Sequence, residues 1–105
     1  MNVLQEIKDC GINVADIKAL RVTYWEYFLN EAIYAKDEKY STISLTKMCQ
    51  ILSSMNYDNT SKCSDIEGMI LMDDNSFYKK CFILGEWKWV RIYLPTIEQV
   101  IYKLI

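Results

Sequence analysis

The sequence predicts one α+β domain, and two features indicate this class. Residues 77–84 and 87–94 are runs rich in β-branched and aromatic residues on either side of a glycine, a pattern typical of an antiparallel hairpin. Several other segments repeat apolar residues at the spacing of amphipathic helices. The chain of 105 residues contains only three glycines and one proline. A chain of this length forms a single core, and so few helix and strand breakers favour long regular elements.

The centre of the predicted hairpin is Gly85 followed by Glu86, and a glycine at this first position predicts a type II′ turn. In the register that this turn sets, Lys80 lies opposite Arg91. One face of the hairpin is then aromatic and cationic, with Tyr78, Lys80, Phe82, Trp87, Trp89, Arg91 and Tyr93. The other face is mostly aliphatic, and we expect it to pack on the core.

Periodicity and capping residues predict five helices, over 1–10, 14–37, 44–55, 59–67 and 96–104. Ser44 is a good N-cap for the third helix, and Pro95 precedes the last. A short strand is expected over 69–72. The segment 60–72 also fits a single helix that contains Gly68, at a cost of about 1 kcal/mol.

The sequence lacks the patterns of a signal peptide and of a membrane-spanning helix, which predicts an intracellular protein. The longest apolar tract, 17–35, contains too many charged and amide side chains to span a bilayer. The first ten residues carry acids and lack the apolar region of a signal peptide. We therefore expect a cytoplasmic localisation.

The inventory of reactive side chains favours a protein without enzymatic activity. There is no histidine to activate a serine or cysteine nucleophile. The four cysteines, Cys10, Cys49, Cys63 and Cys81, are too irregularly spaced for a zinc site and are expected to be small buried side chains. We expect no metal and no cofactor. Whether cysteines form disulfides depends on the redox compartment and stays open.

Charge is distributed unevenly along the chain. The segment 76–94 contains four cations and one acid, which gives it a charge of +3. Because the whole chain carries −2, the remainder carries −5. The sequence thus predicts a basic hairpin on an acidic body.

The order of the predicted elements resembles the winged helix-turn-helix family. The residues that carry the likeness are Ile43 as a first strand, 45–55 as a second helix, 59–67 as a recognition helix and 79–91 as the wing. The likeness covers most of residues 14–94 and consists of element order and hydrophobic pattern.

This resemblance implies binding to duplex DNA, with the recognition helix in the major groove and the wing on the backbone. Base-facing candidates would be Asn59, Ser61 and Lys62. Phosphate contacts would come from the hairpin cations, Lys79, Lys80, Lys88 and Arg91. The expected function is a small transcriptional regulator of the kind that viruses and mobile elements encode.

A second function also fits the sequence, namely a protein-binding adaptor or inhibitor. Such a protein would use its acidic body or the aromatic hairpin face, with Tyr78, Trp87, Trp89 and Tyr93 as anchors. For either function we expect a homodimer, because the segment 24–34 carries aromatic residues on nearly all sides and could pack on its own copy. Alternatively, the aromatic face is covered within the monomer, and the hairpin cations pair with internal acids or stack on aromatic rings.

Overall fold

The computed structural model describes residues 2–25, 28–62, 65–92 and 96–102. Five antiparallel strands form one sheet in the order β2-β1-β3-β4-β5. They are β1 (Ile17–Trp25), β2 (Leu29–Ala35), β3 (Asp65–Met72), β4 (Phe77–Ile83) and β5 (Glu86–Ile92). Three α-helices complete the fold, namely α1 (Val3–Asp9), α2 (Leu45–Ser54) and α3 (Ile97–Tyr102). Single 3₁₀ turns occur at η1 (Val14–Asp16) and η2 (Glu38–Tyr40).

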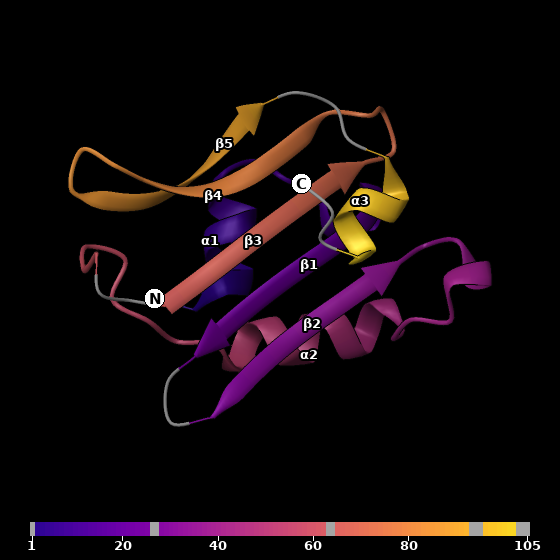
Figure 1. The fold of residues 1–105 in the computed structure, drawn as a ribbon, viewed down its shortest axis with the longest axis horizontal. Helices are drawn as coiled ribbons and strands as arrows, with labels where there is room; N and C mark the ends of the chain where they lie inside the picture. The colour runs from indigo at the N-terminus through magenta and orange to yellow at the C-terminus, as the bar shows by residue number, and fades with distance from the viewer. Residues whose placement is uncertain (1, 26–27, 63–64, 93–95, 103–105) are drawn as a thin grey trace.

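The helices lie on opposite faces of the sheet, with α1 and α2 behind it and the short α3 in front in Figure 1. The larger core lies between the sheet and the pair α1 and α2. A smaller core lies under α3 and is centred on Phe77 and Val100. Because α3 has six residues, it covers only one end of the front face of the sheet. Arg21 and Thr23 lie on the rest of this face.

The largest departure from the sequence prediction concerns 14–37, which is not a helix. After the turn η1, this segment forms the β1–β2 hairpin, with seven regular pairs from Ala19↔Ala35 to Trp25↔Leu29. Most positions of the segment are apolar, and their spacing fits both a helical and an alternating pattern. Its run Val22 to Trp25 of β-branched and aromatic residues favours a strand, and the tertiary pairing decides the outcome.

The predicted recognition helix is also wrong. Residues 65–67 begin β3, which continues through the predicted strand 69–72, while the described residues 59–62 lie in the preceding loop. The prediction of one helix over 60–72 fails for the same reason. A central strand covered on both faces carries a nearly continuous apolar run, and 66–72 shows this pattern.

The β4–β5 hairpin is confirmed, but its turn lies one residue earlier than predicted. Leu84 and Gly85 are the central pair, with φ angles of 51° and 86°. Two positive φ angles identify a type I′ turn. The register therefore moves by two residues and places Lys80 opposite Trp89. A shift of two leaves each side chain on its predicted face.

The helices predicted at 1–10, 44–55 and 96–104 correspond, over their described residues, to α1, α2 and α3, and the α+β class is correct. Asn2 caps α1 through Gln5 N–H, and Ser44 caps α2 through Lys47 N–H. A five-stranded antiparallel sheet, with three α-helices among the described residues, is nonetheless unlike a winged helix, so that assignment is overturned. No helix in the described part of the chain is long and apolar enough to cross a membrane.

Candidate functional site

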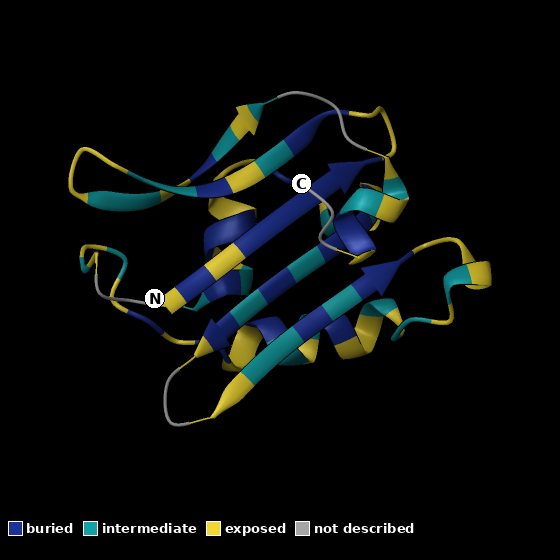
Figure 2. Cartoon of the chain, in the orientation of Figure 1, coloured by how far each residue is buried: buried dark blue, intermediate teal, exposed yellow. Residues whose placement is uncertain are grey.

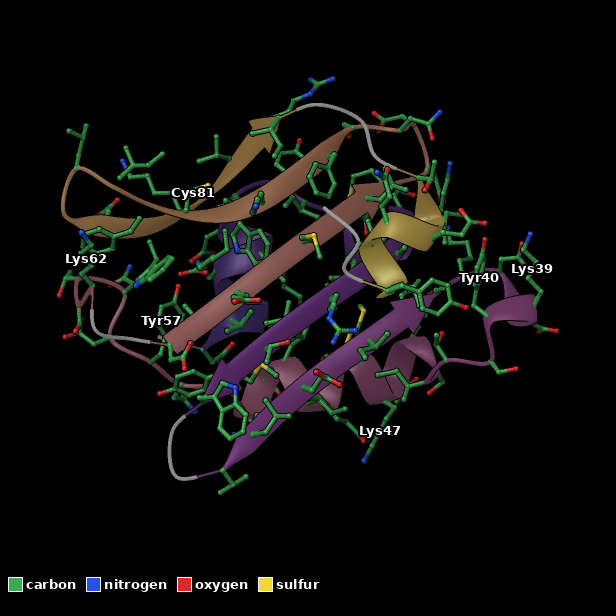
Figure 3. All side chains as sticks on the ribbon, viewed as in Figure 1. Lys39, Tyr40, Lys47, Tyr57, Lys62 and Cys81 are labelled. Carbon is green, nitrogen blue, oxygen red and sulfur yellow. The ribbon has the colours of Figure 1, made fainter. Side chains whose placement is uncertain are left out.

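The three base-facing candidates lie in the loop between α2 and β3. The Asn59 carbonyl accepts from Trp87 N–H at 2.7 Å, and the Ser61 carbonyl accepts from Trp87 Nε1 at 2.9 Å. These two bonds fasten the loop to the start of β5. Lys62 is exposed on the same loop, at the opposite end of the molecule from Lys39 (Figure 3). Without a helix at 59–62, these residues have no rigid element that would place them in a major groove.

The four hairpin cations are divided between the two faces of the sheet. Lys79 and Lys88 are exposed on the face of α3, and Lys88 lies 3.4 Å from Glu86. Arg91 is exposed on the opposite face. The side chain of Lys80 is fully buried. The structure therefore does not gather these cations into one surface that could follow a phosphate backbone.

Lys80 is held in a buried network around Glu6 of α1. Its ammonium pairs with Glu6 Oε1, which also accepts from Trp89 Nε1 at 3.1 Å. The hydroxyl of Tyr57 donates to Glu6 Oε2 at 2.7 Å. The same ammonium lies 5.0 Å from the centroid of the Trp89 ring and 5.1 Å from that of Tyr57, so cation–π contacts complete its surroundings.

Burial is the main cause of the pKa shifts in this network. It lowers the pKa of Lys80 to about 7, and the adjacent Glu6 carboxylate acts in the opposite direction because it stabilises the ammonium. Burial also raises the pKa of the Tyr57 phenol above its usual range. Each charged atom of the pair has close partners, and the network joins α1 to β4, to β5 and to Tyr57 in the loop between α2 and β3. It functions as a structural link.

The aromatic anchors of the predicted partner surface are largely covered. Trp89 is buried in the core beneath α1, Tyr78 and Trp87 are half-buried, and Tyr93 lies outside the described residues. The aromatic face packs on the larger core, so the expectation that the aliphatic face would be the packed side holds only at one end of that face. On that face Phe77 is buried beneath α3, while the rest of the β4–β5 hairpin is half-buried or exposed.

A cavity of about 400 Å³ opens where β4 separates from β3. Strand pairing between them ends at Met69↔Lys79, although both strands continue. Of the residues singled out in the sequence, this cavity brings together Lys79, Lys80 and Trp87. Its walls also carry Glu67, so the lining combines both signs of charge with apolar groups and selects no single ligand chemistry.

The clearest exposed feature is at the free end of the β1–β2 hairpin. Trp25 is 51% exposed, Phe28 is 63% exposed and Leu29 is 42% exposed. We call these three residues the hairpin patch. Trp25 and Leu29 are directly opposite each other on the front face. Among the described residues only six large apolar side chains are exposed, and half of them belong to this patch. Figure 2 shows this end of the β1–β2 hairpin in the colour of exposed residues.

Carboxylates surround the hairpin patch on the same face of the sheet. Asp65 lies across from Trp25 on β3, while Glu31 and Glu67 lie on either side of Thr23 in the next row. Arg21 is the nearest cation of this face and is bound to Glu31 at 3.3 Å. The patch is therefore an apolar centre with an acidic border.

The cysteines differ from the expectation of uniform burial. Cys10 is exposed, Cys49 and Cys81 are half-buried, and all three are free thiols. Cys63 lies outside the described residues. The pKa of Cys10 is raised, mainly by partial burial.

Comparisons with family models, with curated proteins and with solved structures gave no match for this chain.

The hairpin patch could not be predicted while the segment 14–37 that contains it was interpreted as a helix. The sequence from Tyr24 to Phe28 is rich in aromatic residues, but a helix would distribute them on all sides. A strand interpretation would have placed Trp25 and Leu29 on one face, beside a turn.

Proposed function

We propose that this chain is a non-enzymatic protein-binding module that contacts its partner through the hairpin patch. The observation that carries the proposal is the concentration of Trp25, Phe28 and Leu29 at one exposed end of the sheet. Contiguous apolar side chains at a surface mark interaction sites, and tryptophan is enriched among the residues that dominate binding energy.

The border of the patch specifies the chemistry of the partner. Glu31, Asp65 and Glu67 share the front face with Trp25. Burial of the patch brings these carboxylates close to the partner's surface. The partner is therefore expected to offer an apolar pocket with lysine or arginine side chains around it, since like charges at the rim would oppose association.

The hairpin patch is a better candidate for the binding surface than the remaining exposed apolar residues, because a paired strand supports it. Trp25 belongs to the interior strand β1, which pairs on both sides along its length. Leu84, which is 93% exposed, lies at the end of the outer β4–β5 hairpin. A side chain on a paired strand loses less conformational freedom on binding than one on a loop tip.

The test compares a double variant of the hairpin patch with a control at the most exposed apolar side chain outside it. Affinity capture followed by quantitative binding of the recovered partner should use wild type, Trp25→Ser with Phe28→Ser, and Leu84→Ser as the control. We expect the double variant to bind at least about tenfold more weakly, as for hot-spot side chains worth more than about 1 kcal/mol each, and the control to bind normally. Equal binding by the double variant would refute the proposal, provided that its melting temperature matches wild type.

One titration distinguishes a DNA-binding function from the proposed protein-binding function. The exposed cations Lys79, Lys88 and Arg91 would produce binding to random duplex DNA that weakens steeply with salt. The protein-binding function predicts no such salt-dependent binding. Saturable, salt-dependent DNA binding that is lost when these cations are replaced would favour the regulator instead.

A further inference from the structure

The two edge strands of the sheet, β5 and β2, differ in charge and in how far other segments cover them. At the β5 edge, Trp87 N–H donates to the Asn59 carbonyl at 2.7 Å, and Trp87 Nε1 donates to the Ser61 carbonyl at 2.9 Å. The edge strand itself carries the charged residues Glu86, Lys88 and Arg91. A covered and charged edge is protected against pairing with another chain.

The outer edge of β2 is open along most of its length. Ala35 N–H donates to Thr42 Oγ1 at 2.7 Å, whereas Lys36 N–H donates to Lys18 O of the neighbouring β1 at 2.9 Å. Hydrogen-bonding direction alternates along an antiparallel strand. The amides of the odd-numbered residues Leu29, Glu31 and Ile33 must therefore point outward. Within the described ranges, no other strand lies beside them.

β2 also lacks the features that usually prevent edge pairing. It reads LNEAIYA, with one charged residue and no proline. Its seven pairs with β1 continue without a bulge. A long, regular and mostly apolar edge strand is a template for another strand.

We propose that β2 pairs with β2 of a second copy of this chain, antiparallel about a two-fold axis at Ala32. This register places Glu31 opposite Ile33 of the second copy, and both residues have outward amides. It continues the sheet from one copy into the other. A register one step away would place the two Glu31 side chains opposite each other, which like-charge repulsion disfavours.

Charge complementarity supports a second copy as the occupant. Arg21 is the neighbour of Ile33 on β1, so Glu31 of the second copy lies in the same row as Arg21. The guanidinium uses Nη1 for the Ile101 carbonyl at 2.9 Å and Nη2 for its own Glu31, while its Nε is buried without an acceptor. The added carboxylate supplies further acceptor capacity to this incompletely satisfied cation. By symmetry the arrangement occurs twice.

The dimer shares Glu31 with the border of the hairpin patch but not Trp25 and Phe28, which lie at the hairpin end outside the paired segment 30–34, so the two proposals are tested at different residues. Failure of either proposal leaves the other standing. The interface is small, so we expect weak association in the range from about 10 µM to about 1 mM.

The first test is wild-type amide hydrogen exchange measured by NMR at low and high protein concentration. We expect the amides of Glu31 and Ile33 to gain at least tenfold protection at high concentration, as for donors that enter a strand ladder worth more than about 1.4 kcal/mol. The inward amides of Ala32 and Tyr34 should be protected at both concentrations. Unchanged exchange at Glu31 and Ile33 would overturn the proposal.

The second test is sedimentation velocity of wild type, Glu31→Pro and Arg91→Pro. Position 31 has an outward amide, so proline there removes a donor to the second copy and leaves the bonds to β1. Position 91 is the equivalent outward position on β5. We expect Glu31→Pro to remain monomeric and Arg91→Pro to dimerise as wild type does. A wild-type protein that stays monomeric at about 1 mM, or a folded Glu31→Pro that still dimerises, would refute the β2 interface.

Discussion

The indole ring of Trp89 lies directly against the backbone of Gly68. A Cβ at position 68 would overlap Cη2 of Trp89 and lie 2.9 Å from its Cζ3 and 3.3 Å from Lys80 Cβ. The glycine thus lets β5 place a large aromatic side chain over the central strand β3. This contact positions Trp89 for its hydrogen bond to Glu6.

Gly68→Ala should lower the free energy of unfolding by about 1–3 kcal/mol, because a buried ring cannot move away without distorting the core. Urea denaturation measures the change. In a Trp89→Leu background the same substitution should cost much less, since the smaller side chain leaves room for the methyl group. Equal costs in both backgrounds would show that the close approach of these residues is not the cause.

Lys80→Met should destabilise the protein by about 3–5 kcal/mol, because it leaves the Glu6 carboxylate buried without its cation. Adding Glu6→Gln should recover much of this loss, since the neutral amide keeps an oxygen that accepts from Trp89 Nε1 and its NH2 group can donate to the Tyr57 hydroxyl. The control is Lys79→Met, an exposed neighbour that should change stability by no more than about 0.5 kcal/mol. Equal effects at positions 79 and 80 in urea denaturation would contradict a buried ion pair.

Leu84→Asn should raise the free energy of unfolding by about 0.5–1 kcal/mol. Leu84 adopts a φ of 51° at the first central position of a type I′ turn, where asparagine is favoured. Leu84→Val should have the opposite effect, because a β-branched side chain is most strained in this conformation. Thermal denaturation of both variants distinguishes turn strain from a general effect of polarity at this exposed site.

Stability should fall in acid in part through Asp74. The hydroxyl and backbone amide of Ser76 donate to this carboxylate and lower its pKa below the ordinary value of 3.8. Since the folded-state pKa is the lower one, the stabilisation is present above pH 3.8 and is lost as pH falls through the folded value. The free energy of unfolding should be measured at pH 7 and pH 3, about three units above and one unit below the ordinary pKa of this carboxyl. It should change less between these two pH values for Asp74→Asn than for wild type. An unchanged dependence would exclude this carboxyl as a contributor.

Several parts of the fold could be predicted because they follow from local rules. The alternation of 77–92 assigned every hairpin side chain to its correct face, although the turn at Leu84 and Gly85 was placed one residue too late. Ser44 and the apolar spacing that follows it predicted α2. These features depend on neighbours in the sequence.

The remaining parts depend on contacts between distant residues. Glu6 and Lys80 are 74 positions apart, so no local pattern could pair them. The segment 17–35 is apolar at most positions, and only its pairing with β3 distinguishes a strand from a helix. Exposure of the hairpin patch follows from that pairing and could not be predicted before it.

The most direct test of the account is hydroxyl-radical footprinting of wild-type protein in buffer and in extract of its source cell. If the β1–β2 hairpin is the contact surface, Trp25 and Phe28 should lose reactivity in extract, while Leu84 should keep the same reactivity in both. Protection at Leu84 or around Lys79, with Trp25 unchanged, would contradict the account.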